Sequence, residues 1–120
     1  MSCLFNSMNF FLQIPSQTIR NTICDYLEQD KPIIEGIETN QVIKMECVNN
    51  YIGNMRKPST WGGAIEIQAA CNIWNMKVIV INIRNHVKDN NEIVFIPLHE
   101  KIDKTIKITW SGGHYEPVRM

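Results

Sequence analysis

The periodicity of the apolar residues changes once along this chain, just after Trp74. Before that point apolar side chains recur at helical spacing, and beyond it they form β-branched runs and a clean alternation. Helices are therefore expected first, and a small sheet of mostly C-terminal strands after them. This segregation predicts an α+β fold, since a doubly wound fold would alternate the two kinds of element. The 120 residues, 44% of them hydrophobic, suit one domain over residues 1–120.

The spacing of apolar residues, Pro and Gly predicts the individual elements. The helices are expected over residues 3–12, 16–29, about 40–53 and 64–74. The strands are expected over residues 78–83, 92–97, 105–110 and 114–118. The first helix is mostly apolar and is expected to be buried on most sides, and Ser16 is expected to cap the second. Connectors are expected over residues 33–39, 56–63 and 84–91.

Charge and cysteine content argue against several classes of function. Lys and Arg total 12, as do Asp and Glu, and this zero net charge without a basic stripe argues against nucleic-acid binding. No apolar run approaches the ~20 residues that a bilayer requires, so no membrane partner is expected. The four cysteines are Cys3, Cys24, Cys47 and Cys71. They form no C-x-x-C motif and no Cys/His cluster, so no metal site is expected. The chain is expected in an intracellular, reducing compartment.

Cys3 is the candidate nucleophile because it opens the first expected helix. The N-terminus of a helix stabilises a thiolate through its free N–H groups and partial positive charge. The other cysteines lie within helical apolar patterns and are expected to be buried and inert. The alternative interpretation of Cys3 is also a small buried hydrophobic residue.

His114 is the candidate base because it follows a glycine pair at 112–113, which permits close approach of another chain. It also begins the last expected strand, so period 2 places Glu116 on the same side of that strand. A carboxylate there can orient the imidazole, as in a catalytic triad, although it is equally interpreted as an exposed edge-strand charge. His86 and His99 lie in polar segments and are expected to be solvated.

Three segments of the chain resemble, in order, the motifs of one protease family. Segment 3–7 (CLFNS) resembles the end of an Asp-Gly-Asn-Cys-Leu-Phe motif, and segment 61–69 (WGGAIEIQA) resembles Trp-Gly-x-x-x-Glu-Leu-x-Ala. Segment 113–118 (GHYEPV) resembles Gly-His-Tyr-Asp/Asn-x-Val. Together they resemble the ovarian-tumour (OTU) family of papain-like cysteine proteases, which are mostly deubiquitinases.

The resemblance implies a papain-like OTU-type fold and a deubiquitinase that cleaves the isopeptide bond after the C-terminal glycine of ubiquitin or a ubiquitin-like modifier. Cys3 would be the nucleophile, His114 the general base, and Glu116 the group that orients the histidine, where the family has Asp or Asn. No metal or cofactor is implied, and the implied partners are the modifier and polyubiquitin chains. The small size and the richness in Ile, Asn and Lys suggest a compact viral or parasite member.

The family's oxyanion hole uses backbone N–H groups of the loop before the cysteine. Here the resemblance assigns that role to Met1, Ser2 and the N–H of Cys3, and the family's Asp three residues before the cysteine falls just before Met1. Each oxyanion donor is worth roughly 2.7–4 kcal/mol, so a deformed loop would lower the rate several hundred-fold.

Four further residues in these motifs have expected roles. Trp110 and Tyr115 flank the histidine and either wall a narrow channel for an extended peptide or belong to the core. Trp61 and Glu66 are expected to be architectural, through core packing and through the polar face of a helix.

Three other functions stay open at this point. A catalytically weak or inactive module would keep the fold and bind ubiquitin. A structural α/β domain would keep Cys3 and His114 apart. A thiol acyltransferase would use the same pair to pass an acyl group to an amine.

Overall fold

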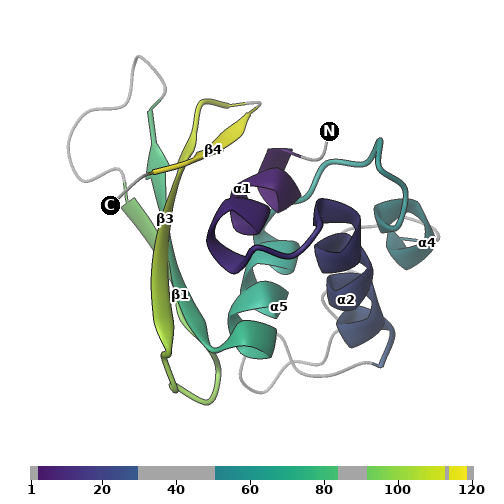
Figure 1. The fold of residues 1–120 in the computed structure, drawn as a ribbon, viewed down its shortest axis with the longest axis horizontal. Helices are drawn as coiled ribbons and strands as arrows, with labels where there is room; N and C mark the ends of the chain where they lie inside the picture. The colour runs from purple at the N-terminus through teal and green to yellow at the C-terminus, as the bar shows by residue number, and fades with distance from the viewer. Residues whose placement is uncertain (1–2, 30–50, 84–91, 113, 119–120) are drawn as a thin grey trace.

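The computed structural model describes residues 3–29, 51–83, 92–112 and 114–118. Figure 1 shows a sheet on one side of the molecule and helices packed against one of its faces, so the predicted α+β architecture is confirmed. The expected connectors over 33–39 and 84–91 and most of the helix expected over 40–53 lie outside the described residues.

The described helices agree closely with the sequence pattern. They are α1 (Cys3–Leu12), α2 (Ser16–Glu28), α4 (Tyr51–Met55) and α5 (Ala64–Trp74). Gly53 does not close its helix, since α4 continues to Met55. The prediction that Ser16 caps α2 is wrong, because the extended backbone of Pro15 occupies the cap position and Ser16 is the first helical residue. The Ser16 hydroxyl instead donates a hydrogen bond of 2.5 Å to Oδ1 of Asn6 on α1.

Four strands form one mixed sheet in the order β2-β1-β3-β4. They are β1 (Met76–Asn82), β2 (Glu92–Phe95), β3 (Lys104–Trp110) and β4 (Tyr115–Pro117). β1 pairs antiparallel with β2 and parallel with β3, and β3 pairs antiparallel with β4. The sheet thus brings the last strand, β4, to one edge, where it lies against α1.

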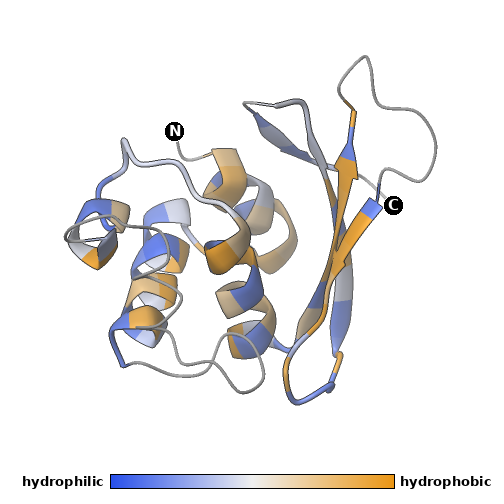
Figure 2. Cartoon of the chain, turned by 180° about the vertical axis from the view of Figure 1, so that it is seen from behind, coloured by the Kyte–Doolittle hydropathy of each residue, from blue (hydrophilic) through white to orange (hydrophobic). Residues whose placement is uncertain are grey.

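The hydrophobic core lies between the sheet and the helices. Residues 78–80 of β1 are all buried, but Ile81 is half-buried and Ile83 is 52% exposed, so the burial on both faces predicted for residues 78–83 holds only for their first half. β3 alternates, with Ile106 and Ile108 buried. Figure 2 shows hydrophobic residues concentrated along β1 and β2. The burial predicted for α1 holds for its first half, whereas Phe10 near its end is exposed.

One charged side chain in the core was not predicted from the sequence. Arg20 of α2 is 0% exposed, and its guanidinium carbon lies 4.2 Å from the centre of the Phe5 ring on α1. Its Nη1 donates a hydrogen bond of 2.7 Å to the carbonyl oxygen of Met55. Arg20 of α2 therefore contacts both α1, through Phe5, and α4, through Met55.

Candidate active site

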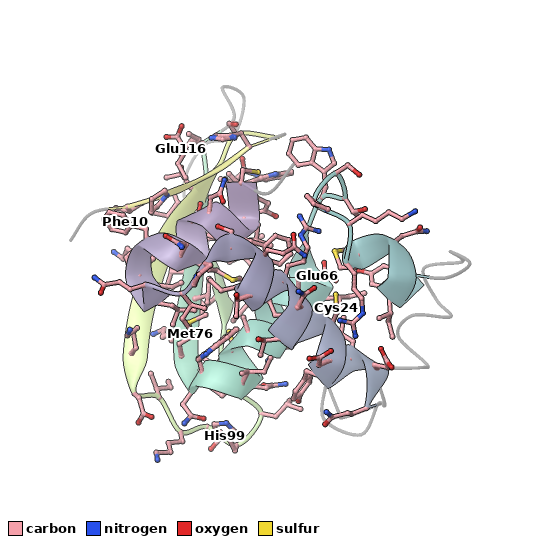
Figure 3. All side chains as sticks on the ribbon, turned by 45° about the vertical axis from the view of Figure 1, so that its right-hand side comes forward. Phe10, Cys24, Glu66, Met76, His99 and Glu116 are labelled. Carbon is pink, nitrogen blue, oxygen red and sulfur yellow. The ribbon has the colours of Figure 1, made fainter. Side chains whose placement is uncertain are left out.

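A pocket of about 380 Å³ lies between the first turn of α1 and strand β4, and both Cys3 and His114 line it. The packing of α1 against β4 produces this arrangement, because α1 begins at Cys3 and β4 begins immediately after His114. The two candidate residues from opposite ends of the chain thus share one pocket. Figure 3 shows Glu116 at this end of the molecule and His99 at the opposite end.

Cys3 is the first residue of α1 and is 8% exposed. The side chains of Asn6 and Ser7, one helical turn further on, line the same pocket. The Ser7 hydroxyl donates a hydrogen bond of 2.8 Å to the carbonyl oxygen of Cys3 and so ties down the first turn. These two residues were missed from the sequence, although a spacing of three and four residues on a helix predicts a shared face.

The imidazole of His114 is held by its neighbour in the chain. Its Nε2 lies 3.2 Å from Oε1 of Glu116, and the two side chains are 55% and 67% exposed. The longer Glu therefore reaches the ring from the position where the family has Asp or Asn. Because Nε2 is engaged by the carboxylate, Nδ1 is the ring nitrogen that remains for a thiol. The prediction that His114 begins the last strand is wrong, because β4 begins at the next residue, Tyr115.

The two aromatic residues that flank His114 in the sequence occupy different positions. Tyr115 lines the pocket of Cys3, whereas Trp110 lines a neighbouring apolar cavity together with Tyr115. Burial raises the pKa of the Tyr115 hydroxyl, and negative charge at Cys3 and Glu66 raises it further. The phenol therefore stays protonated beside the pocket. A channel for substrate between these aromatics stays a prediction.

The prediction that Trp61 packs in the core is wrong, because Trp61 is 49% exposed. The close contact with α1 is made by Gly62, where an added Cβ would lie 2.8 Å from Leu4 Cδ2 and 2.9 Å from Phe5 Cζ. Only a glycine fits against these two buried side chains. Trp61, next to it, lines a separate hollow of about 520 Å³ between α4 and the start of α5.

Glu66 is architectural, but it does not lie on an exposed polar helix face. It is 1% exposed, and its Oε1 accepts a hydrogen bond of 2.7 Å from the N–H of Gly63, which caps α5. Its Oε2 accepts a hydrogen bond of 2.6 Å from the Tyr51 hydroxyl of α4. The buried carboxylate therefore holds the segment that seats Gly62 on α1.

The other described cysteines and His99 do not line the pocket of Cys3. Cys24 and Cys71 are buried and free, as predicted, and burial raises their thiol pKa to about 11 and about 12. His99 is exposed, as predicted. The residues predicted to matter that lie outside the described ranges are Met1, Ser2, Cys47 and His86.

The described residues contain neither a grouping suited to a metal ion nor a helix suited to span a membrane. Within the described ranges, no three His, Cys, Asp or Glu side chains are grouped so that they could hold a metal ion. No helix in that part of the chain has both the length and the apolar character needed to cross a bilayer.

Comparison with known proteins identifies the family. A family model described as OTU-like cysteine protease matches residues 2–116. The chain therefore belongs to the family of OTU-like cysteine proteases. Ubiquitin thioesterase otu2 of Schizosaccharomyces pombe is 30% identical to it over 130 residues, which cover 95% of this chain and 41% of that protein. The chain thus spans about two fifths of the length of this curated relative.

Solved structures share the fold. An ovarian tumor (OTU) domain in complex with ubiquitin has a TM-score of 0.73 and 25% identity, over 97% of this chain and 62% of that one. The OTUD1 OTU domain has a TM-score of 0.72 and 13% identity, over 99% of this chain and 79% of that one. The OTU-type fold implied by the sequence motifs is therefore confirmed.

Proposed function

We propose that this chain is a cysteine-dependent deubiquitinase that cleaves the isopeptide bond after the C-terminal glycine of ubiquitin or of a ubiquitin-like modifier. The observation that carries the proposal is the pocket shared by Cys3 and His114, with His114 Nε2 held 3.2 Å from Glu116 Oε1. Membership of the OTU-like cysteine protease family supports it. So does the relative that is named a ubiquitin thioesterase.

The reaction would proceed through a thioester on Cys3. His114 takes the thiol proton, and the sulfur of Cys3 attacks the carbonyl carbon of the modifier's terminal glycine. The carbon–nitrogen bond then breaks, and His114 gives its proton to the departing lysine amine. His114 then takes a proton from water, and the resulting hydroxide attacks the thioester carbonyl carbon. The carbon–sulfur bond breaks, the modifier leaves with a free carboxylate, and His114 returns its proton to the Cys3 thiolate. Glu116 orients the imidazole and stabilises its charged form.

The backbone at the start of α1 is suited to the negative oxygen that forms during both attacks. The N–H of Cys3 belongs to the first turn of the helix, where N–H groups have no partner within the helix and the local charge is partly positive. We assign the remaining oxyanion donors to Met1 and Ser2, which precede Cys3 in the chain.

The partners and the compartment follow from this chemistry. Ubiquitin, a ubiquitin-like modifier or a polyubiquitin chain would be the partner, and an OTU domain of the same fold has been solved in complex with ubiquitin. A reducing intracellular compartment would keep the free thiol of Cys3 available, and the three cysteines in the described part of the chain are all free. A viral or parasite origin stays a prediction.

The direct test uses ubiquitin that carries an electrophile at its C-terminus. We expect a covalent adduct on Cys3, detected by the intact mass and localised by peptide mapping. The adduct should be lost in Cys3→Ala and kept in Cys24→Ala, because Cys24 is buried away from the pocket. In His114→Ala the adduct should form about a hundredfold more slowly, as expected for removal of a general base.

The other functions predict different outcomes. Binding of ubiquitin without an adduct would indicate a binding module. If ubiquitin neither binds nor forms an adduct, the proposal is contradicted and the chain is a structural domain. Transfer of the acyl group to an added amine in preference to water would indicate an acyltransferase.

A further inference from the structure

The sheet has a second face, which is turned away from the described helices. Figure 1 shows these helices together on one side of the sheet, and Val78 and Val80 of β1 point to that side, into the core. Successive side chains of a strand point to opposite faces, so Ile79 and Ile81 point the other way. We call the side that carries Ile79 and Ile81 the outer face of the sheet.

The outer face carries apolar side chains along β1 and β2. Val94 of β2 lies on this face because it pairs directly with Ile79. Ile83 continues the β1 row beyond the strand, since its N–H still donates a hydrogen bond of 2.9 Å to the carbonyl oxygen of Trp110 on β3. Val94 is 49% exposed and Ile83 is 52% exposed. Neighbouring apolar side chains left in water in this way favour burial against a second surface.

The charged side chains of the outer face are separated by sign along the strands. One row across all four strands is acidic at both edges, and its cross-strand neighbours are Glu92, Ile81, Thr109 and Glu116. In the next row on this face, Lys107 pairs with Ile79. In the row after that, Lys77 pairs with Thr105. The outer face therefore has an acidic end and a basic end.

We propose that the outer face is the interface of a homodimer, in which two copies of this chain stack their sheets about a two-fold axis. The axis lies between the sheets and crosses the strands at the row of Ile79 and Val94. It places the acidic row of one copy over the Lys77 row of the other, and it places the two Val94 side chains opposite each other. The same surface meets itself, so each favourable contact occurs twice. Stacked sheets lie about 10 Å apart, within reach of Lys and Glu side chains from both copies.

Charge and area favour a second copy as the occupant of this face. The formal net charge of the chain is zero, so two copies do not repel each other at long range. Four strands about 4.8 Å apart, the longest of seven residues, give a face of at most roughly 450 Å². A standard interface buries about 800 Å² of each partner, so the geometry points to a weak and reversible dimer.

Sedimentation velocity of the full chain between about 1 µM and 1 mM tests this association. We expect a reversible shift from monomer to dimer with a Kd near about 100 µM, as fits an interface below the standard size. Raising the salt concentration to about 0.5 M should weaken the dimer several-fold, because exposed charges are then screened. Association through this face does not depend on the proposed hydrolysis, so the dimer is expected whether or not ubiquitin is cleaved.

A charge placed at the two-fold axis should break the dimer. Val94→Lys removes an apolar contact and brings two like charges together, so we expect the Kd to rise at least about tenfold. The matched control is Trp61→Lys, which adds the same charge at a residue that is also 49% exposed but lies between α4 and α5. It should leave the Kd unchanged. The thermal unfolding midpoints of both variants should stay near that of the unmodified chain.

A charge swap tests how the two copies are oriented. Lys77→Glu opposes the acidic row of the other copy and should raise the Kd about tenfold, whereas Lys77→Glu combined with Glu92→Lys should bring the Kd back to within about threefold. Glu92 pairs with Ile81, so in one copy it lies about 13 Å along the strands from Lys77, beyond the Debye length of about 8 Å. Rescue by the double variant therefore reports a contact between copies.

Three results would overturn the inference. The first is a chain that stays monomeric up to about 1 mM, because the outer face would then have no affinity for itself. The second is a dimer whose Kd is the same in Val94→Lys and Trp61→Lys, because association would then use a different surface. The third is a double variant that associates no better than Lys77→Glu, because the acidic and basic ends would then not face each other.

Discussion

The length of the Glu116 side chain determines how the imidazole of His114 is held. Its carboxylate reaches Nε2 at 3.2 Å along the edge of the sheet, and both side chains are more than half exposed. Water therefore competes for the same hydrogen bonds, and the net stabilisation by this pair is small in the resting protein. Its value to catalysis is greater when His114 carries a proton and substrate excludes water from the pocket.

We therefore expect Glu116→Gln to lower kcat while leaving KM unchanged. The amide oxygen can still orient the ring, but it no longer stabilises the imidazolium, so a loss of about tenfold is expected. Steady-state hydrolysis of a ubiquitin C-terminal fluorogenic amide measures it. Glu100→Gln is the matched control at an exposed glutamate far from the pocket, and equal rates for the two variants would contradict the role of Glu116.

At the residue scale, the sequence predicts the pair that shares the pocket but not the buried charges beside it. Cys3 and His114 stood out because few residue types can perform this chemistry, and period 2 placed Glu116 next to the histidine. Arg20 and Glu66 were missed as core residues because burial of a charge depends on partners far away in the sequence. For Arg20 those partners are the Phe5 ring and the Met55 carbonyl.

At the scale of elements, the connection between α4 and α5 positions the first turn of α1. Gly62 lies directly against Leu4 and Phe5, the two residues that follow Cys3, and both of those side chains are almost fully buried. Glu66 fixes the connection from the other side through the N–H of Gly63. The position of Cys3 therefore depends on the close approach of a backbone segment about sixty residues away in the sequence.

Substitution of the two adjacent glycines tests this dependence. Gly62→Ala would place its Cβ within 3.0 Å of Leu4 and Phe5, which have no free space to move into, so we expect a loss of about 1–3 kcal/mol in the free energy of unfolding. The displaced α1 should also lower the rate of adduct formation at Cys3. Gly63→Ala meets only Glu66 Oε1 at 3.9 Å and is the matched control.

Urea unfolding and adduct kinetics should separate the two glycine variants. If both variants lose the same stability and rate, the contact of Gly62 with α1 would not be what positions Cys3. The sequence predicted a loop over 56–63, because Pro and Gly interrupt the helical pattern there. It did not distinguish the two glycines, because the difference lies in which one contacts α1.

At the scale of the whole molecule, the order of the helices and strands was predictable and their pairing was not. A change of period tells where helices end and strands begin. It contains no information on the parallel pairing of β1 with β3, which places β2 at one edge and β4 at the other. That order is what brings β4, and His114 just before it, to α1.

The two thiols buried in the core, Cys24 and Cys71, make the free energy of unfolding depend on pH. Burial raises the pKa of Cys24 to about 11 and that of Cys71 to about 12, from an ordinary value of 9.0. Below pH 9 the folded and unfolded chains both retain these two protons, and the stabilisation is fully present. Above pH 9 the unfolded chain loses them while the folded chain keeps them, so the free energy of unfolding falls until the folded thiols ionise.

We expect the double variant Cys24→Ala, Cys71→Ala to lose less stability than the unmodified chain between pH 9 and about 11. Each buried thiol contributes at most about 1.4 kcal/mol per pH unit to the slope, because one proton is released on unfolding. Urea unfolding at several pH values measures the slope, and lysine and tyrosine titrations are the same in both chains. The double variant will be less stable overall, since truncation leaves small cavities, but that offset does not change with pH. Equal slopes in the two chains would show that these thiols ionise alike in the folded and unfolded states.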